Sequence, residues 1–393
     1  MKKLNRAMPY FFVEKKINLI YNHLSKFRKV KMEKQIEKEF EKTLKAIEKA
    51  KNIVIIGHSM PDGDSIGSQK ALKYFLEYLG KNVYILAKNV SLKVEKTVST
   101  DDIINLKSEL LNLKKEDIDI SIFVDMPNLT RVDEEFKDFK NTKFKICIDH
   151  HEGNELFADI NIHKIMTSTT ELVYLLIKYY FKENYLDFMN SEKTREFYLK
   201  IMKNIMLGLI TDSGGFRHQN MNVLAFNIAA EAMENNIDLF NIYRINIIEK
   251  SETEFNLDKY IRDRIQFLLG GKIAFMYLTK EDKCYMEKKV GEDESLVNIG
   301  KEYEGNKISI LVKEVNDGFK FSVRTNVPYS AYNIAKTFNG GGHIGAAGAD
   351  IFISNMDKLS KEEKMSIINF IKEKLVLSSL NEINKVEKKD ENC

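Results

Sequence analysis

The sequence contains little cysteine, little proline and no tryptophan, and these absences exclude several classes of protein. Its 393 residues include 3 Cys, 4 Pro and 19 Gly. The cysteines, Cys147, Cys284 and Cys393, are far apart and form no Cys-x-x-Cys pair, so we expect neither a disulfide framework nor a zinc knuckle. A reducing, cytoplasmic location fits this use of cysteine. The chain also lacks an apolar run of about 20 residues, so we expect no contact with a membrane through a spanning helix.

Positive charge is scarce outside the first 31 residues. Residues 1–31 contain nine Lys or Arg and one acidic residue, Glu14. The whole chain carries a net charge of +3, so the +8 of this segment leaves −5 for residues 32–393. A surface that coats nucleic acid is therefore not expected, and an anionic ligand must meet a local site. Apolar spacing predicts that residues 1–31 form a basic helical extension, which could touch nucleic acid or a membrane surface, although a solvated segment is the simpler interpretation.

Short apolar runs alternate with helical segments after residue 50, and this alternation predicts an α/β fold. The runs at 53–56, 83–86, 120–124 and 144–148 indicate buried strands of a parallel sheet. A second group of strands is predicted at 273–278, 307–315, 319–324 and 349–353, with helices near 330–338 and 360–377. The predicted order is a basic helical extension (1–31), a parallel-sheet domain (32–250), a helical connector (251–270), a smaller mixed α/β domain (271–379) and a charged tail (380–393).

Histidine and aspartate side chains follow the apolar runs of the first domain at the points where the runs end. They are His58, Asp62 and Asp64 after the first run, Asp125 after the run 120–124, Asp149, His150 and His151 after the run 144–148, and Asp212 after the run 205–210. One aspartate in such a place commonly caps the next helix. Four such segments together favour a site, because ligands bind at the carboxyl edge of parallel sheets.

The mixture of His and Asp favours divalent metal ions. It suits Mn²⁺ best, with Mg²⁺, Co²⁺ and Zn²⁺ as less fitting choices, and the absence of Cys removes the soft alternatives. The candidate ligands are His58, Asp62, Asp64, Asp125, His150 and Asp212. These are too many for one ion that must keep an open position, so we expect two ions. In two-metal hydrolases the ions lie about 3.5–4 Å apart and hold the attacking and leaving oxygens of a phosphoryl group.

The strings His58-x-x-x-Asp62-x-Asp64, Asp125, Asp149-His150-His151 and Asp212-Ser-Gly resemble, in this order, the four motifs of the DHH phosphoesterase superfamily. The resemblance implies that His58, Asp62 and Asp125 hold one metal and that Asp64, Asp125, His150 and Asp212 hold the other. Asp125 then bridges the two ions. The resemblance also implies that Asp149 is a catalytic carboxylate that orients an imidazole or shuttles a proton, and that His151 faces the substrate phosphate.

A glycine-rich string in the second domain is the other candidate for binding. It runs Phe338-Asn-Gly340-Gly341-Gly342-His343, and its backbone N–H groups could surround an anion, although a glycine triplet can also be a simple turn. The string resembles the Gly-Gly-Gly-His loop of the DHH-associated domain of the first type, and Arg324 lies where that family carries a phosphate-binding Arg. The resemblance implies that Arg324, Gly340, Gly341, Gly342 and His343 bind substrate, that His343 also assists catalysis, and that the active site lies in the cleft between the domains.

The two-domain arrangement resembles the nanoRNase group of this superfamily. The group implies hydrolysis of short oligoribonucleotides to mononucleotides and of adenosine 3′,5′-bisphosphate (pAp) to AMP. Substrates would therefore be the partners, with no stable protein partner implied and a homodimer possible. Two alternatives stay open: a phosphodiesterase for linear dinucleotides such as pApA or pGpG left by cyclic-dinucleotide turnover, and a nucleotide-binding module without catalysis.

Overall fold

The computed structural model describes residues 34–104, 114–218, 220–285, 293–342 and 344–390. The basic helical extension predicted at 1–31 lies outside the described residues. The chain divides into two compact units, Met1–Glu249 and Lys250–Cys393. Each unit has its own sheet and its own hydrophobic core.

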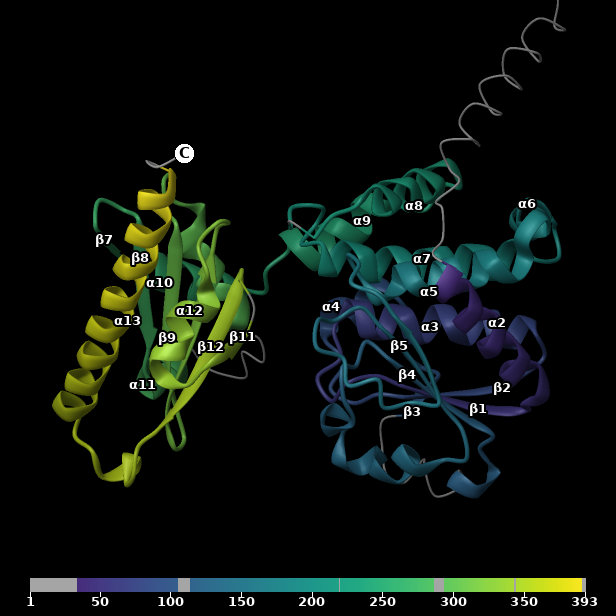
Figure 1. Ribbon diagram of the computed structural model, residues 1–393, viewed down its shortest axis with the longest axis horizontal. Coiled ribbons are helices and arrows are strands. Elements are labelled where there is room, and N and C mark those ends of the chain that lie inside the picture. The colour runs from purple at the N-terminus through teal and green to yellow at the C-terminus, as the bar shows by residue number, and fades with distance from the viewer. Residues whose placement is uncertain (1–33, 105–113, 219, 286–292, 343, 391–393) are drawn as a thin grey trace, which may run out of the picture. The chain divides into compact units, whose positions relative to one another are not determined.

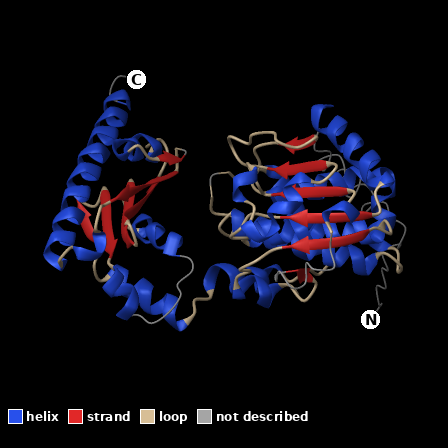
Figure 2. Ribbon diagram, turned by 90° about the horizontal axis from the view of Figure 1, so that it is seen from below, coloured by secondary structure: helices blue, strands red, loops and turns tan. Residues whose placement is uncertain are grey.

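The N-terminal unit is built on a parallel sheet (Figures 1 and 2). Its strands are β1 (Asn52–Ile56), β2 (Asn82–Leu86), β3 (Ile103–Ile104), β4 (Ile120–Val124), β5 (Lys145–Asp149) and β6 (Ile160–His163). They lie in the order β3-β2-β1-β4-β5-β6, and neighbouring strands are parallel throughout. All five residues of β4 are buried, as expected for a central strand that is covered on both faces. The predicted α/β fold with a parallel N-terminal sheet is confirmed.

Helices cover one face of this sheet, and shorter segments cover the other. The helices are α2 (Lys34–Lys49), α3 (Gly63–Tyr78), α4 (Leu92–Thr97), α5 (Thr169–Phe181), α6 (Tyr185–Asn190), α7 (Arg195–Asp212), α8 (Val223–Glu234) and α9 (Leu239–Tyr243), followed by a π-helical turn at Arg244–Ile248. Short 3₁₀ segments lie at Lys115–Asp117, Leu129–Arg131, Glu134–Asn141 and Lys182–Asn184. Side chains alternate along β1, so Ile53 and Ile55 join the core with α3, α5 and α7, whereas Val54 and Ile56 join a smaller core with Phe136.

Helices α3 and α7 pack unusually closely because glycines lie between them. A Cβ atom on Gly67 would lie 2.5 Å from the carbonyl oxygen of Asn204. A Cβ atom on Gly208 would lie 2.6 Å from Oδ1 of Asp64. The glycines therefore let the N-terminal turn of α3 approach α7, which brings Asp64 toward the end of α7, where Asp212 lies.

The C-terminal unit has a mixed sheet in the order β11-β12-β10-β9-β8-β7. The strands are β7 (Gln266–Leu268), β8 (Ile273–Leu278), β9 (Ile308–Val315), β10 (Gly318–Thr325), β11 (Gly341–Gly342) and β12 (Ala346–Phe352). Among the described strands of this unit, β8 and β9 form the one parallel pair, and the other neighbours are antiparallel. The helices are α10 (Glu252–Arg262), α11 (Lys280–Tyr285), α12 (Ala331–Ala335) and α13 (Lys361–Asp390), with 3₁₀ segments at Asp293–Glu302, Lys336–Phe338 and Met356–Lys358. Helix α13 packs its buried Ile368, Ile371 and Leu375 against the core of this sheet.

Two predicted boundaries in the C-terminal half differ from the structure. Residues 380–393 were expected to be a charged tail, but α13 continues to Asp390 and Ile383 is buried in the core. This segment contains many charged residues and few apolar ones. The helical spacing of its apolar residues is therefore hard to see in the sequence. The connector expected at 251–270 is helical only over Glu252–Arg262, and Gln266–Leu268 instead forms edge strand β7. Among the described residues, no helix is both long enough and apolar enough to cross a bilayer.

Candidate metal centre

The loop after β1 carries the first group of candidate ligands. His58 lies two residues beyond the strand, and its Nε2 atom is 3.9 Å from Oδ1 of Asp62 and 3.4 Å from Oδ2 of Asp125. Asp62 is also the N-cap of α3, because its Oδ1 accepts hydrogen bonds from the N–H groups of Asp64 and Ser65 at 2.9 and 3.0 Å. A carboxylate accepts several bonds at once, so the cap fixes Asp62 without excluding a cation.

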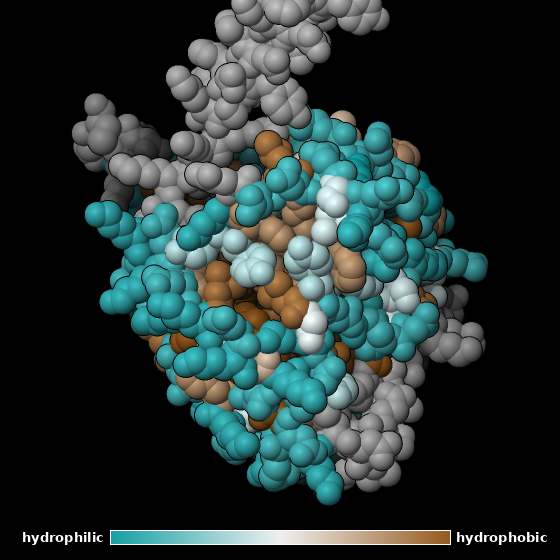
Figure 3. Space-filling model, turned by 90° about the vertical axis from the view of Figure 1, so that its right-hand side faces the viewer, coloured by the Kyte–Doolittle hydropathy of each residue, from teal (hydrophilic) through white to brown (hydrophobic). Residues whose placement is uncertain are grey.

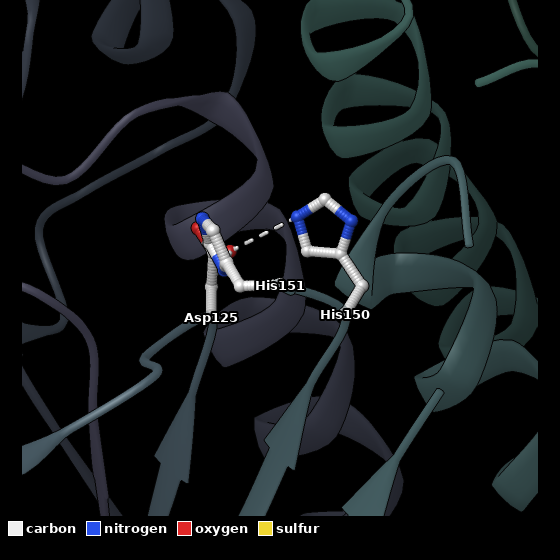
Figure 4. Close-up of side chains that lie close together, drawn as sticks. All are labelled: Asp125, His150 and His151. Atoms are coloured by element: carbon white, nitrogen blue, oxygen red, sulfur yellow. Dashed lines mark ion pairs between the residues drawn. The ribbon is translucent and has the colours of Figure 1, made fainter. Parts of the chain in front are cut away.

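Asp125 lies at the centre of the site, directly after β4. Its side chain is buried, and its two oxygens face different partners. Oδ2 lies 3.4 Å from Nε2 of His58, whereas Oδ1 lies 3.6 Å from Nε2 of His150 and 3.5 Å from Nδ1 of His151 (Figure 4). The residue has a φ of 56°, in the left-handed region that Asp tolerates better than most residues. Strain of this kind is typical of a functional position.

The second group of candidate ligands combines α3, β5 and α7. Nε2 of His150 lies 3.2 Å from Oδ2 of Asp212 and 4.0 Å from Oδ2 of Asp64. Nδ1 of His150 lies 3.2 Å from the carbonyl oxygen of Met166, so Nδ1 carries the proton and Nε2 faces the carboxylates. Asp64 is fully buried, and its two oxygens accept hydrogen bonds from the N–H groups of Thr169 (2.7 Å) and Thr170 (3.0 Å).

Asp149 and His151 form a hydrogen-bonded pair beside Asp125. Oδ1 of the buried Asp149 lies 2.8 Å from Nδ1 of His151, and its Oδ2 accepts bonds from the backbone N–H of His151 and from Nδ2 of Asn154. Burial alone lowers the pKa of His151, but the hydrogen bond to Asp149 and the charge of Asp125 outweigh it and raise that pKa. The carboxylate therefore fixes the orientation of the imidazole.

The crowding of carboxylates shifts their pKa values in opposite directions. Burial would raise the pKa of Asp125, but the hydrogen bond with His58 and the charges of the surrounding histidines lower it to about 2. Burial, followed by the charge of Asp125, raises the pKa of Asp64 well above its ordinary value. Burial, followed by the charge of Asp64, does the same to Asp212. Nearby divalent cations would relieve this repulsion.

The donor atoms are grouped closely enough to hold divalent metal ions. Within each of three groups, one donor atom from every residue lies within 4.8 Å of the others: His58, Asp62 and Asp125; Asp64, His150 and Asp212; and Asp125, His150 and His151. Each set combines carboxylate oxygen with imidazole nitrogen, which suits Mn²⁺ or a similar ion. The structure thus brings together all six predicted ligands, with Asp125 between the first two groups; their individual roles stay predictions.

Of the predicted phosphate-binding residues that the structure describes, Arg324 lies on β10 and Gly341 and Gly342 lie on β11, with β12 between these two strands. Arg324 on β10 pairs with Ala346 on β12, and a cavity of about 330 Å³ is lined by β10, including Arg324 and Lys320, and by β12, including Gly348 and Asp350. Burial and the charge of Arg324 lower the pKa of Lys301, so a second cation lies near this arginine. Gly341 and Gly342 form the short strand β11 rather than an open loop, and His343 lies outside the described residues.

Glycine is needed at position 340, where the chain enters β11. A Cβ atom there would lie 2.4 Å from the carbonyl oxygen of Gly348. The backbone of the glycine-rich segment therefore packs directly on β12, with no room for a side chain.

Some residues that hold the candidate ligands in place were not predicted from the sequence. The N–H groups at the start of α5 bind Asp64, and Oγ1 of Thr169 lies 3.4 Å from Oδ1 of Asp125. Asn154 holds Asp149. The start of α5 could have been predicted, because Ser168 and Glu171 have the spacing of a capping box, which marks the beginning of a helix.

A separate cavity lies away from these residues. It has a volume of about 620 Å³ and is lined by α2, by Leu79 and Lys81 after α3, and by Tyr179, Tyr180 and Lys182 at the end of α5. Figure 3 shows the face on which these elements lie, where apolar side chains form the floor of a hollow with hydrophilic side chains around it. None of the predicted site residues lines this cavity.

Comparisons with known proteins agree with this arrangement. Residues 52–207 match the model of the DHH family, N-terminal domain, and residues 272–374 match that of the DHHA1 domain. Over 320 residues the chain is 26% identical to the bifunctional oligoribonuclease and PAP phosphatase NrnA of Thermus thermophilus, covering 80% of this chain and 88% of that protein. The protein of the same name from Bacillus subtilis is 22% identical over 326 residues, 79% of this chain and 96% of the relative.

A solved structure shows the same fold. An exopolyphosphatase-related protein from Bacteroides fragilis is 26% identical, covers 86% of this chain and 97% of its own, and superposes with a TM-score of 0.72. Fold, site and these matches together support a hydrolase of the DHH class. The chain carries a DHH domain over residues 52–207 and a DHHA1 domain over residues 272–374.

Proposed function

We propose that the protein is a Mn²⁺-dependent phosphoesterase that converts short oligoribonucleotides to mononucleotides and pAp to AMP. The observation that carries this proposal is the position of Asp125, which offers one oxygen to the group of His58 and the other to the group of His150. Two cation sites that share a carboxylate suit in-line displacement at phosphorus. The relatives named as oligoribonuclease and PAP phosphatase support the substrate class.

Residues of the N-terminal unit would bind the metal ions and transfer protons. His58, Asp62 and Asp125 would hold one ion, and Asp64, Asp125, His150 and Asp212 the other. Such ions, when bound, lower the pKa of water and stabilise charge on phosphate oxygens. Nδ1 of His151 is committed to Asp149, so its Nε2 atom is the one available to exchange a proton with a reacting oxygen. Asn154 keeps Asp149 in the orientation that this requires.

The second unit would supply the groups that hold substrate. Arg324 provides a charged fork suited to a phosphate, and the nearby charge of Lys301 strengthens the local positive potential. Gly340, Gly341, Gly342 and His343 would add backbone and imidazole donors. We expect His343 to assist catalysis by stabilising negative charge that develops on the phosphate.

A turnover panel tests the function. Purified chain with Mn²⁺ is incubated with pAp, the linear dinucleotide pApA, a five-residue oligoribonucleotide and a cyclic dinucleotide, and products are separated by chromatography. We expect AMP from pAp and mononucleotides from the short oligomers. Activity on linear dinucleotides alone would favour the phosphodiesterase alternative. No turnover of any substrate, with Mn²⁺ still bound, would favour the non-catalytic nucleotide-binding module.

A pair of variants separates the two roles. His343→Ala should lower kcat/KM by an amount that corresponds to a loss of roughly 2 to 4 kcal/mol of transition-state stabilisation. The metal content should not change. Asp212→Ala should instead reduce the amount of bound Mn²⁺. Loss of metal in His343→Ala would show that the glycine-rich segment is a ligand donor.

A further inference from the structure

Arg131 lies beside the candidate metal centre, on the 3₁₀ segment Leu129–Arg131 that follows β4. Its carbonyl oxygen accepts a 2.8 Å hydrogen bond from the backbone N–H of Ser59, the residue after His58. Burial and the charge of Arg131 lower the pKa of His151, although the nearby carboxylates raise that pKa by more. The guanidinium is therefore close enough to act on groups of the candidate site.

The backbone that carries Arg131 is held by two loops that bear candidate ligands. The loop after β1 binds it through the N–H of Ser59. The loop after β5 binds the same segment through a 2.9 Å hydrogen bond from the N–H of Glu155 to the carbonyl oxygen of Pro127. Between these bonds Leu129 packs against the smaller core of the unit. The position from which the Arg131 side chain extends is therefore fixed relative to the ligands.

The guanidinium of Arg131 has no partner within the described part of the chain. It makes no hydrogen bond and no ion pair there, and the residue is exposed. The other three arginines described in the N-terminal unit each hydrogen-bond through the guanidinium: Arg195 with Asn235, Arg217 with the carbonyl oxygen of Gly214, and Arg244 with Asn241. A guanidinium presents its N–H donors in a planar fork that suits a carboxylate or a phosphate. Arg131 therefore offers this fork to an anion from outside the described chain.

The charge of the metal centre shows why a substrate needs such a cation. Five aspartates gather there: Asp62, Asp64, Asp125, Asp149 and Asp212. With all five ionised, two divalent cations would still leave a net negative charge. A substrate with two phosphate groups adds about 1.5 to 2 negative charges for each of them. Metal ions can neutralise the reacting phosphate, so the second phosphate needs a cation of its own.

Exposure indicates which phosphate Arg131 meets. Asp125 and Asp149 are buried, whereas Arg131 is exposed, so its guanidinium lies on the outer side of the ligands. The reacting phosphate has to approach the buried ligand atoms, and a second phosphate of the same substrate then lies farther out. We propose that Arg131 binds this second phosphate, which is the 5′-phosphate of pAp or the adjacent phosphate of a short oligoribonucleotide. The inference rests on the proposed function and names the group of the N-terminal unit that distinguishes substrates with two phosphates from those with one.

A pair of adenosine nucleotides isolates this contact. pAp and adenosine 3′-monophosphate share the reacting 3′-phosphate, and of the two only pAp has a second phosphate. With Mn²⁺, Arg131→Gln should raise KM for pAp roughly 10- to 100-fold, the range for losing hydrogen bonds to a charged group. The same variant should leave kcat/KM for adenosine 3′-monophosphate unchanged.

Two further variants serve as references. Arg131→Lys keeps the charge without the planar fork, so its KM for pAp should fall between those of the wild type and Arg131→Gln. Lys137→Gln is a matched control, because it removes one positive charge from an exposed side chain nearby in the sequence, which pairs with Glu134. Its kinetics on both nucleotides should equal those of the wild type.

Three results would overturn the inference. Equal losses on both nucleotides would mean that Arg131 acts on the reacting phosphate or on the metal ions. Loss of bound Mn²⁺ from Arg131→Gln would mean that the residue supports the ligands. Unchanged kinetics on pAp would show that the second phosphate is held elsewhere.

Binding measured without turnover separates this inference from the proposed function. Isothermal titration calorimetry on the full chain, with Ca²⁺ in place of Mn²⁺, compares pAp with adenosine 3′-monophosphate. We expect the wild type to bind pAp roughly 10- to 100-fold more tightly, and Arg131→Gln to bind both nucleotides alike. A wild type that binds pAp no better than adenosine 3′-monophosphate would overturn the inference, whether or not it hydrolyses them. A wild type that prefers pAp through Arg131 but does not hydrolyse it with Mn²⁺ would overturn the proposed function alone.

Discussion

The backbone N–H of Thr169 donates a 2.7 Å hydrogen bond to Oδ2 of Asp64, although 105 residues separate them in the sequence. The start of α5 therefore acts as a fixed support for a candidate metal ligand on α3. The same residue reaches the second group of ligands, since its Oγ1 atom lies 3.4 Å from Oδ1 of Asp125. One helix start thus orients two carboxylates.

We predict that Thr169→Val weakens Mn²⁺ binding by about 10-fold, the lower end of the range for losing a group that orients a ligand. The substitution removes the hydroxyl near Asp125 but leaves the backbone bond to Asp64. Thr169→Ser should bind Mn²⁺ like the wild type. Isothermal titration calorimetry on both variants measures the affinity, and equal affinity in Thr169→Val would show that the hydroxyl has no orienting role.

Asp125→Asn should abolish turnover and reduce the Mn²⁺ content below that of Asp212→Asn. The reason is that Asp125 faces both groups of ligand atoms, whereas Asp212 belongs to one of them. Metal analysis after dialysis, with the fold checked by circular dichroism, measures this difference. Similar metal content in the two variants would contradict a bridging role for Asp125.

Gly208→Ala should impair metal binding without a ligand being changed. The added methyl group would lie 2.6 Å from Oδ1 of Asp64 and would push against that carboxylate. We expect a destabilisation of about 1 to 3 kcal/mol, as for overpacked cores, together with a loss of Mn²⁺ affinity of at least about 10-fold. Gly80→Ala is a control, because it strains the backbone at a φ of 75° while its added Cβ meets no atom within 4 Å. Equal Mn²⁺ affinity in the two variants would show that α3 and α7 adjust freely.

The thiol of Cys147 should resist alkylation in the folded protein. Burial, followed by the charge of Asp149, raises the pKa of this thiol to about 12. An unfolded thiol deprotonates near pH 9, so the folded state binds more protons between about pH 9 and 12 and its stability falls as the pH rises through that window. In a Cys284→Ser, Cys393→Ser background, modification at pH 8.5 should occur in urea but not in buffer, as mass spectrometry can measure. Rapid modification in buffer would show that β5 opens readily.

Much of the parallel sheet could be predicted because its central strands are continuous apolar runs. All five residues of β4 are buried, so a short, mostly apolar run in the sequence is enough to locate this strand. Strand β6 was missed because Ile160 and Ile162 alternate with half-buried polar residues at the edge of the sheet. The short strand β11 was missed because two glycines carry no strand preference of their own.

The candidate ligands could be predicted, but their supports could not. Aspartate and histidine at the ends of apolar runs are visible in the sequence, since parallel strands deliver their carboxyl ends to one edge. The bonds from Thr169 and Thr170 to Asp64 depend on how α5 packs against α3, which is a tertiary relationship. Local spacing carries no information about a partner more than 100 residues away.

The positive φ of Asp125 limits how this position can evolve. A backbone at 56° is accessible to Gly and Asn with little strain, whereas β-branched residues would distort the end of β4. A descendant that kept the fold and abandoned catalysis would therefore tend to replace Asp125 by Asn or Gly. The residue at this one position would distinguish an active lineage from one that retains only the scaffold.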